Sequence, residues 1–163
     1  MFEAATISTT DPLEFHAELA RQAKGLLAGE RDWIANAANL AALIFTTLPD
    51  LNWAGFYILK GDTLVLGPFQ GKPACVRIAK GRGVCGAAAE LLRTLRVDDV
   101  NDFPDHIACD TASRSELVVP LIRDGAVLGV LDLDSPRRGR FSAIDQAGVE
   151  RLAAIFVGAS DLP

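Results

Sequence analysis

The segment Phe103–Glu116, FPDHIACDTASRSE, sets a cysteine after a histidine and ahead of two carboxylates. Cys109 follows His106 by three residues, about one turn of a helix, and Glu116 comes at the end of the segment. A cysteine in such company can be a small buried side chain, a metal ligand or a nucleophilic thiolate. A protonated histidine nearby would lower the pKa of the Cys109 thiol. The residues alone leave all three roles open.

Two further cysteines, Cys75 and Cys85, could supply a second thiol. Cys85 directly precedes the helix-forming run GAAAELL, so the positive end of a helix dipole could lower its pKa and make it a rival nucleophile. The spacing ranks neither cysteine above the other. Three cysteines cannot all pair within one chain, which argues against a permanent disulfide framework.

Acidic and aromatic residues recur at strand spacing. Asp132 and Asp134 alternate with leucines in GVLDLDS, so on a strand both carboxylates point to one face. Like charges this close raise the pKa of at least one carboxyl, which suits a general acid near neutral pH. Glu116 can equally be a solvated charge at the start of a strand. Trp53 and Tyr57, in NWAGFY, also share a face, and aromatic strand residues are most often part of the core.

The surrounding pattern predicts helices at both ends of the chain and two antiparallel hairpins between them. Apolar periodicity and turn residues place helices at 11–27, 31–48, 87–95 and 142–158, the last capped by Ser142, and strands at 52–59, 63–69, 75–79, 95–100, 116–122 and 126–135. Residues 101–115 have turn chemistry throughout and are expected to form a long functional loop. These elements predict an α+β fold of one domain, with a central antiparallel sheet flanked by N-terminal and C-terminal helices.

Composition excludes several function classes. The 163 residues carry a net charge of −5, which argues against a nucleic-acid partner, and no apolar window is long enough for a membrane span. The start MFEAATISTTDP lacks the pattern of a secretory signal, so we expect a cytoplasmic protein. The glycine-containing string KGRGVCG matches neither a P-loop nor a dinucleotide fingerprint, and we expect no cofactor.

Several motifs in order resemble one enzyme family. NWAGFY, GPFQGKPAC, GRGVCGAAAE, FPDHIACDTASRSELVVPL and GVLDLDS are similar to the free methionine (R)-sulfoxide reductases, which are built on the GAF domain. The resemblance implies a single GAF-like domain over 1–163, with an N-terminal helical segment at 1–29 and a catalytic core at 30–160. Asp105 departs from the pattern, because the family typically has glycine there.

The resemblance also implies a role for each candidate residue. Cys109 falls on the position of the catalytic cysteine, Cys75 on that of the resolving cysteine, and Cys85 would be an alternate partner or relay. Sulfoxide reduction by a thiol needs such a pair, because the sulfenic acid that forms must be resolved by a second thiol. The resemblance also implies that Glu116 and Asp134 form the acid and hydrogen-bonding network and that Asp132 binds the substrate ammonium. Trp53 would form the apolar wall around the S-methyl group, and Tyr57 is expected as a further substrate-binding residue.

The implied partners are free methionine (R)-sulfoxide as substrate and a thioredoxin-like dithiol as reductant. The resemblance also implies a homodimer formed through the N-terminal helices and a role against oxidative stress. Two rival readings stay open. GAF domains in general bind small ligands, so the chain could be a sensor without chemistry. A zinc site of His106, Cys109, Cys85 and Cys75 is the other, although the sequence has no C-x-x-C knuckle and we expect no resident metal.

Overall fold

The computed structural model describes residues 4–107 and 109–163. Within them the helices are α1 (Pro12–Leu26), α2 (Trp33–Thr47), α3 (Gly83–Leu91) and α4 (Ala143–Ala159). The strands are β1 (Trp53–Lys60), β2 (Thr63–Gly71), β3 (Arg77–Ala79), β4 (Leu95–Val97), β5 (Ser115–Arg123) and β6 (Ala126–Ser135), and a short 3₁₀ turn spans Val100–Asp102.

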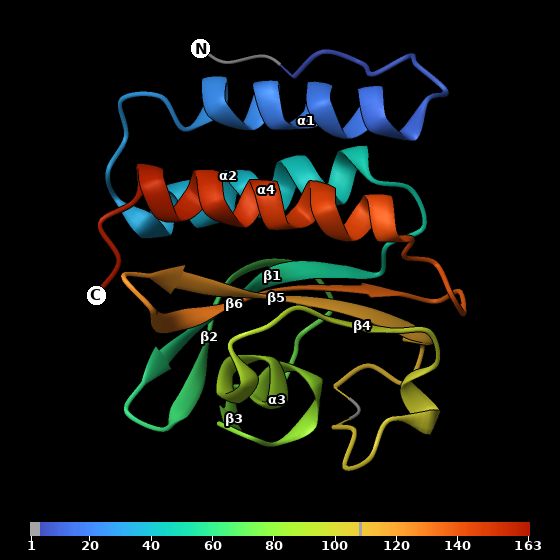
Figure 1. The fold of residues 1–163 in the computed structure, drawn as a ribbon, viewed down its shortest axis with the longest axis vertical. Coiled ribbons are helices and arrows are strands. Elements are labelled where there is room, and N and C mark those ends of the chain that lie inside the picture. The colour runs from blue at the N-terminus through green and yellow to red at the C-terminus, as the bar shows by residue number, and fades with distance from the viewer. Residues whose placement is uncertain (1–3, 108) are drawn as a thin grey trace.

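The strands of the described residues form one antiparallel sheet in the order β3-β2-β1-β6-β5-β4. Helices α2 and α4 cover one face of the sheet, and α1 lies on their outer side (Figure 1). Helix α3 and the loop that follows β4 lie on the opposite face. The predicted α+β class, with an antiparallel sheet between terminal helices, is confirmed. None of the helices in residues 4–107 and 109–163 has the length and apolarity to cross a bilayer.

Strand alternation divides the hydrophobic core into two parts. On β6, Leu131 and Leu133 are fully buried in the cluster beneath α2 and α4, together with Phe56 of β1. Their strand neighbours face α3 instead, where Tyr57 and Val130 belong to a second, smaller cluster. Successive side chains on a strand point to opposite faces, so the LDLD alternation sends its leucines to one core and its carboxylates to the other side of the sheet.

Most element boundaries follow the predicted ones, and α3 is the exception. Ser142 caps α4 as predicted: its hydroxyl accepts from the backbone N–H of Asp145, whose carboxylate accepts from the N–H of Ser142 in return. Helix α3 was expected at 87–95 but begins at Gly83, inside the glycine-containing string. Gly86 is needed there for close packing, because a Cβ would lie 2.4 Å from the carbonyl oxygen of Ala79.

The long segment between β4 and β5 is irregular, as its turn chemistry predicted. Asp105, which stands where the resembling family has glycine, has φ 57° in this segment. This is the left-handed region that glycine adopts freely and that aspartate tolerates better than most residues. The chain therefore keeps the glycine-like turn ahead of Cys109 despite the substitution.

Candidate active site

A small cavity that is open to solvent lies between α3, the sheet and the loop after β4. Seven of the eight predicted site residues line it: Trp53, Tyr57, Cys85, Cys109, Glu116, Asp132 and Asp134. The eighth, Cys75, is bonded to one of these. The structure therefore brings residues from six separate parts of the chain to one place.

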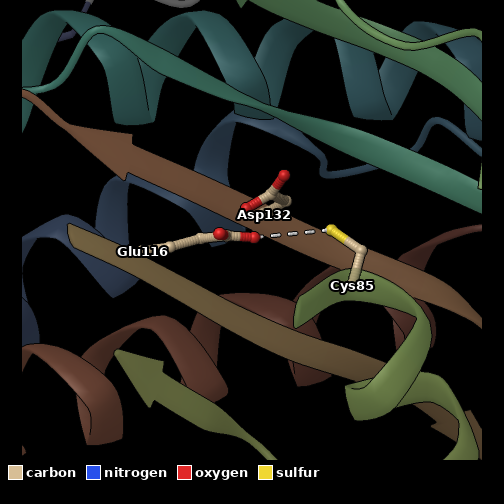
Figure 2. A group of neighbouring side chains, drawn as sticks. All are labelled: Cys85, Glu116 and Asp132. Carbon is tan, nitrogen blue, oxygen red and sulfur yellow. Dashed lines mark hydrogen bonds between the residues drawn. The ribbon is translucent and has the colours of Figure 1, made fainter. Parts of the chain in front are cut away.

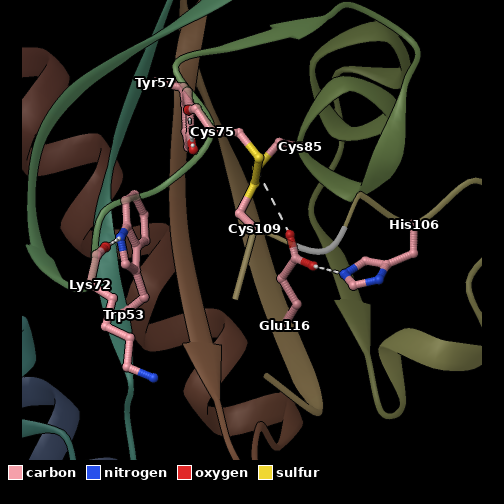
Figure 3. The surroundings of a disulfide bond; sticks show 8 residues. All are labelled: Trp53, Tyr57, Lys72, Cys75, Cys85, His106, Cys109 and Glu116. Atoms are coloured by element: carbon pink, nitrogen blue, oxygen red, sulfur yellow. Dashed lines mark hydrogen bonds and ion pairs between the residues drawn. A yellow bond between two sulfur atoms is a disulfide. The ribbon is translucent and has the colours of Figure 1, made fainter. Parts of the chain in front are cut away.

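Cys75 and Cys109 form a disulfide at this cavity, with an S–S distance of 2.08 Å and a Cα–Cα distance of 5.4 Å (Figure 3). The two residues are 34 positions apart, one ahead of β3 and the other in the loop after β4. Both side chains are partly exposed. Of the two cysteines considered as a second thiol, Cys75 is thus the one joined to Cys109, whereas Cys85 keeps a free, buried thiol.

Trp53 and Tyr57 stack on one another and also hold the segment that carries Cys75. The Trp53 indole N–H donates to the carbonyl of Lys72 (3.2 Å), and the Tyr57 hydroxyl donates to the carbonyl of Cys75 (3.0 Å). The indole lies over Gly55, where a Cβ would come within 2.6 Å of its ring. The aromatic pair is therefore both part of the smaller core and a wall of the cavity.

Three carboxyl groups face the same cavity. Glu116 and Asp132 are only 6% and 5% exposed, so the solvated charge considered for Glu116 was wrong. Burial raises the pKa of Asp132 to about 7. Burial, followed by the negative charge of Asp132, raises the pKa of Glu116 and of Asp134 well above the ordinary range. The site therefore holds carboxylic acids that keep a proton near neutral pH.

Cys85 is an unreactive thiol in this setting. It lies in the first turn of α3 rather than just before the helix as expected, and burial and then the charges of Asp132 and Glu116 raise its pKa well above that of a free thiol. Its Sγ donates to Oε1 of Glu116 (3.8 Å). The expectation that the helix dipole makes Cys85 a rival nucleophile is therefore wrong, because two carboxyls and desolvation outweigh a partial charge.

His106 contacts Glu116, with Nε2 lying 3.8 Å from Oε2 (Figure 3). Burial lowers the pKa of its imidazole, so His106 is mainly neutral at neutral pH and is a poor source of the positive charge expected beside Cys109. The zinc set considered as a rival is not available in this structure, since two of its four sulfur and nitrogen donors are joined in the disulfide.

A polar network beside the cavity was not anticipated from the sequence. The side-chain amide of Asn52 donates to Asp110 (3.2 Å) and to the Ser113 hydroxyl (3.0 Å). Asp110 also lies 3.6 Å from Nζ of Lys72. These contacts tie the Cys109 loop to the Cys75 segment. Asp110 accepts from the N–H of Ala112, a local turn pattern that could have singled it out.

This arrangement of sheet, helices and cavity agrees with comparisons to known proteins. Residues 35–159 match the model of the GAF domain. A structure from Burkholderia vietnamiensis, described as that of a GAF sensor protein, is 55% identical, covers 93% of this chain and 96% of its own, and superposes with a TM-score of 0.89. The chain is a GAF-domain protein.

Two relatives define the family more closely. The free methionine-R-sulfoxide reductase of Escherichia coli is 53% identical over 141 residues, which is 86% of either chain. The structure of the enzyme of that name from Neisseria meningitidis, in complex with its substrate, is 43% identical, has a TM-score of 0.93 and covers 98% of this chain and 95% of its own. The chain belongs to the family of free methionine-R-sulfoxide reductases.

Proposed function

We propose that this protein reduces free methionine (R)-sulfoxide to methionine with two of its own thiols. The observation that carries the proposal is the Cys75–Cys109 disulfide at the mouth of a cavity lined by three protonatable carboxyls. Sulfoxide reduction needs a thiol pair that can close into a disulfide and an acid that can protonate the departing oxygen. One cavity holds both.

In the first step, the Cys109 thiolate attacks the sulfoxide sulfur. The sulfur–sulfur bond formed by this attack then breaks as the oxygen moves from the substrate sulfur to the sulfur of Cys109, which gives methionine and a cysteine sulfenic acid. Glu116 is the proposed proton donor to that oxygen, with Asp134 supporting it through the shared network. The raised pKa of Glu116 keeps the proton on the acid at neutral pH, where an ordinary glutamate would have lost it.

In the second step, the Cys75 thiol attacks the sulfenic sulfur, the disulfide forms and water leaves. The disulfide in the structure corresponds to the product of this step. A thioredoxin-like dithiol then reduces it by exchange, because both cysteines are partly exposed to an incoming thiolate. A dithiol donor of that kind fits the predicted cytoplasmic location. We also propose that the protein forms a homodimer through its N-terminal helices.

Selectivity for the free amino acid rests on Asp132. Among the residues that the structure describes, Oδ1 of Asp132 is buried without a hydrogen-bond partner. A buried carboxylate oxygen of this kind is costly unless a donor or cation meets it. The ammonium group of a free amino acid offers this oxygen both hydrogen-bond donors and a positive charge, whereas the single amide N–H of a peptide-bound methionine sulfoxide offers a donor without the charge.

A coupled assay with thioredoxin and its reductase tests the proposal directly. We expect turnover of free methionine (R)-sulfoxide, much slower turnover of the (S) epimer, and a specificity constant for the N-acetylated (R) substrate lower by a thousandfold or more, as expected when several kcal/mol of desolvation is left uncompensated. A ligand sensor would bind methionine sulfoxide without consuming thiols. Unchanged thiol titre after incubation with substrate would therefore favour the sensor and contradict the proposal.

A further inference from the structure

Three metal-binding side chains converge on the floor of the cavity, apart from the redox pair. One donor atom each from Cys85, Glu116 and Asp132 lies within 4.8 Å of the other two (Figure 2). They come from α3, β5 and β6, so three separate elements fix their positions. All three side chains are buried. The set differs from the histidine and cysteine combination considered from the sequence, because its two oxygen donors come from the sheet.

One carboxyl group of the cluster has a buried oxygen that lacks a hydrogen-bond partner in the described residues. Asp132 is only 5% exposed, and its Oδ1 has no hydrogen-bond partner within the described part of the chain. The same carboxylate lines the cavity, so a small cation can reach it from the mouth. The contact between the Cys85 thiol and Glu116 shows that sulfur and carboxylate already approach each other.

We propose that Cys85, Glu116 and Asp132 form a reversible, inhibitory binding site for a thiophilic divalent cation of the Zn²⁺ type. Zn²⁺ takes sulfur at about 2.3 Å and carboxylate oxygen at about 2.0–2.2 Å, usually with four ligands. Donor atoms that span up to 4.8 Å need only a modest contraction to reach those distances. Water occupies the fourth position, since the three side chains supply one donor each.

Binding releases protons and blocks the substrate. The Cys85 thiol must lose its proton to bind the metal, so Zn²⁺ enters and at least one H⁺ leaves with no change of oxidation state. Thiolate favours soft or borderline cations over Mg²⁺ and Ca²⁺, which prefer oxygen ligands and retain water. The bound cation also occupies the carboxylate assigned to the substrate ammonium. This competition rests on the proposed function, whereas metal binding itself does not.

Disulfide-bonded protein separates this site from the redox thiols. Once Cys75 and Cys109 are joined, Cys85 is the single remaining thiol of the chain. Titration of that oxidised protein with Co²⁺ should give one bound ion with a thiolate-to-cobalt absorption band, and Zn²⁺ should displace it. Mg²⁺ at the same concentration should do neither. Isothermal titration with Zn²⁺ in two buffers of different ionisation enthalpy should report the released proton.

Variants identify the ligands. Cys85→Ser should abolish the cobalt band and weaken Zn²⁺ binding by more than about a hundredfold. Mutation of a residue that only hydrogen-bonds to a metal ligand already lowers metal affinity by ten- to a hundredfold, and loss of the ligand itself should cost more. Asp132→Asn should weaken binding while keeping the band, and it provides a second variant if Cys85→Ser folds poorly. Asp134→Asn is the matched control, since Asp134 lines the cavity but lies outside the cluster, and it should bind Zn²⁺ within a fewfold of the parent.

Two results would overturn the site: equal Zn²⁺ affinity in the parent and in Cys85→Ser, or binding of Mg²⁺ as strong as that of Zn²⁺. Free methionine (R)-sulfoxide should raise the apparent dissociation constant for Zn²⁺, and its failure to do so would refute the inhibitory role. An enzyme that turns over but binds no Zn²⁺ refutes this inference alone. A protein that binds Zn²⁺ without turning over methionine sulfoxide refutes the proposed function alone.

Discussion

Replacing Asp132 by asparagine should make the folded protein more stable at alkaline pH. Burial raises the pKa of this carboxyl from 3.8 to about 7, so the folded state holds its proton more tightly than the unfolded chain does. The stabilising effect of that proton is fully present below pH 3.8 and is lost as the pH rises to about 7. Above pH 7 the ionised Asp132 carboxylate therefore destabilises the folded state.

The size of this effect follows from the same pKa. One pH unit of difference corresponds to 1.36 kcal/mol, so ionised Asp132 destabilises the folded state by about 4 kcal/mol. The amide of Asp132→Asn cannot ionise, but it still leaves a buried polar atom without a partner, which costs about 1–3 kcal/mol. We expect the variant to gain about 1–3 kcal/mol in the free energy of unfolding at pH 9 and nothing at pH 4.

Urea unfolding of the disulfide-bonded protein at these two pH values measures the difference. Asp110→Asn is the control, because the N–H of Ala112 and then the amide of Asn52 lower the pKa of that carboxyl despite some burial. It should lose stability at pH 9 rather than gain it. An Asp132→Asn variant that is no more stable than the parent at pH 9, or that gains equally at pH 4 and pH 9, would refute the reasoning.

Three further outcomes follow from the site and the fold. Cys109→Ser should abolish turnover, whereas Cys75→Ser should release one methionine per enzyme in a single turnover and leave a sulfenic acid that a dimedone-type reagent traps. Because burial raises the pKa of Glu116, the kcat of the parent should fall as the pH rises above neutrality, and Glu116→Gln should lose about a hundred- to ten-thousandfold in kcat, with little change in substrate binding. Burial acts to raise the pKa of Asp145, but hydrogen bonds from His16 and from the N-cap of α4 outweigh it and hold this pKa low. The resulting stability is fully present above about pH 4 and is lost progressively as the pH falls below it, so Asp145→Asn should cost about 1–2 kcal/mol in urea unfolding at pH 7 and less at pH 2.

Periodicity was sufficient to predict the sheet and most helix ends, because strand alternation and capping are local properties. The LDLD run illustrates this: two leucines enter one core and two aspartates face the other side, as the period of two requires. The predicted start of α3 was wrong because Gly86 was interpreted as part of a loop. Its absent Cβ instead allows close contact with the backbone of Ala79, a tertiary requirement that no local pattern carries.

The electrostatics of the site could not be predicted from neighbours in the sequence. Cys85 was assigned a low pKa from its own helix, yet the groups that raise it, Asp132 and Glu116, come from strands that follow later in the chain. His106 was expected to act on Cys109, its neighbour in sequence, and it lies instead against Glu116. Local spacing identifies which side chains can react, but burial and long-range contacts decide their protonation.

The disulfide encloses β3, α3 and β4, a 34-residue span that forms one side of the cavity. Joining two points this far apart restricts the unfolded chain, an entropic effect of about 4 kcal/mol for a span of this length. Each catalytic cycle would thus add a crosslink and remove it again. If the proposed cycle operates, the enzyme would accumulate in its crosslinked form when reductant is scarce and should then resist proteolysis longest. Its lifetime in the cell would then depend on the supply of electrons as well as on its sequence.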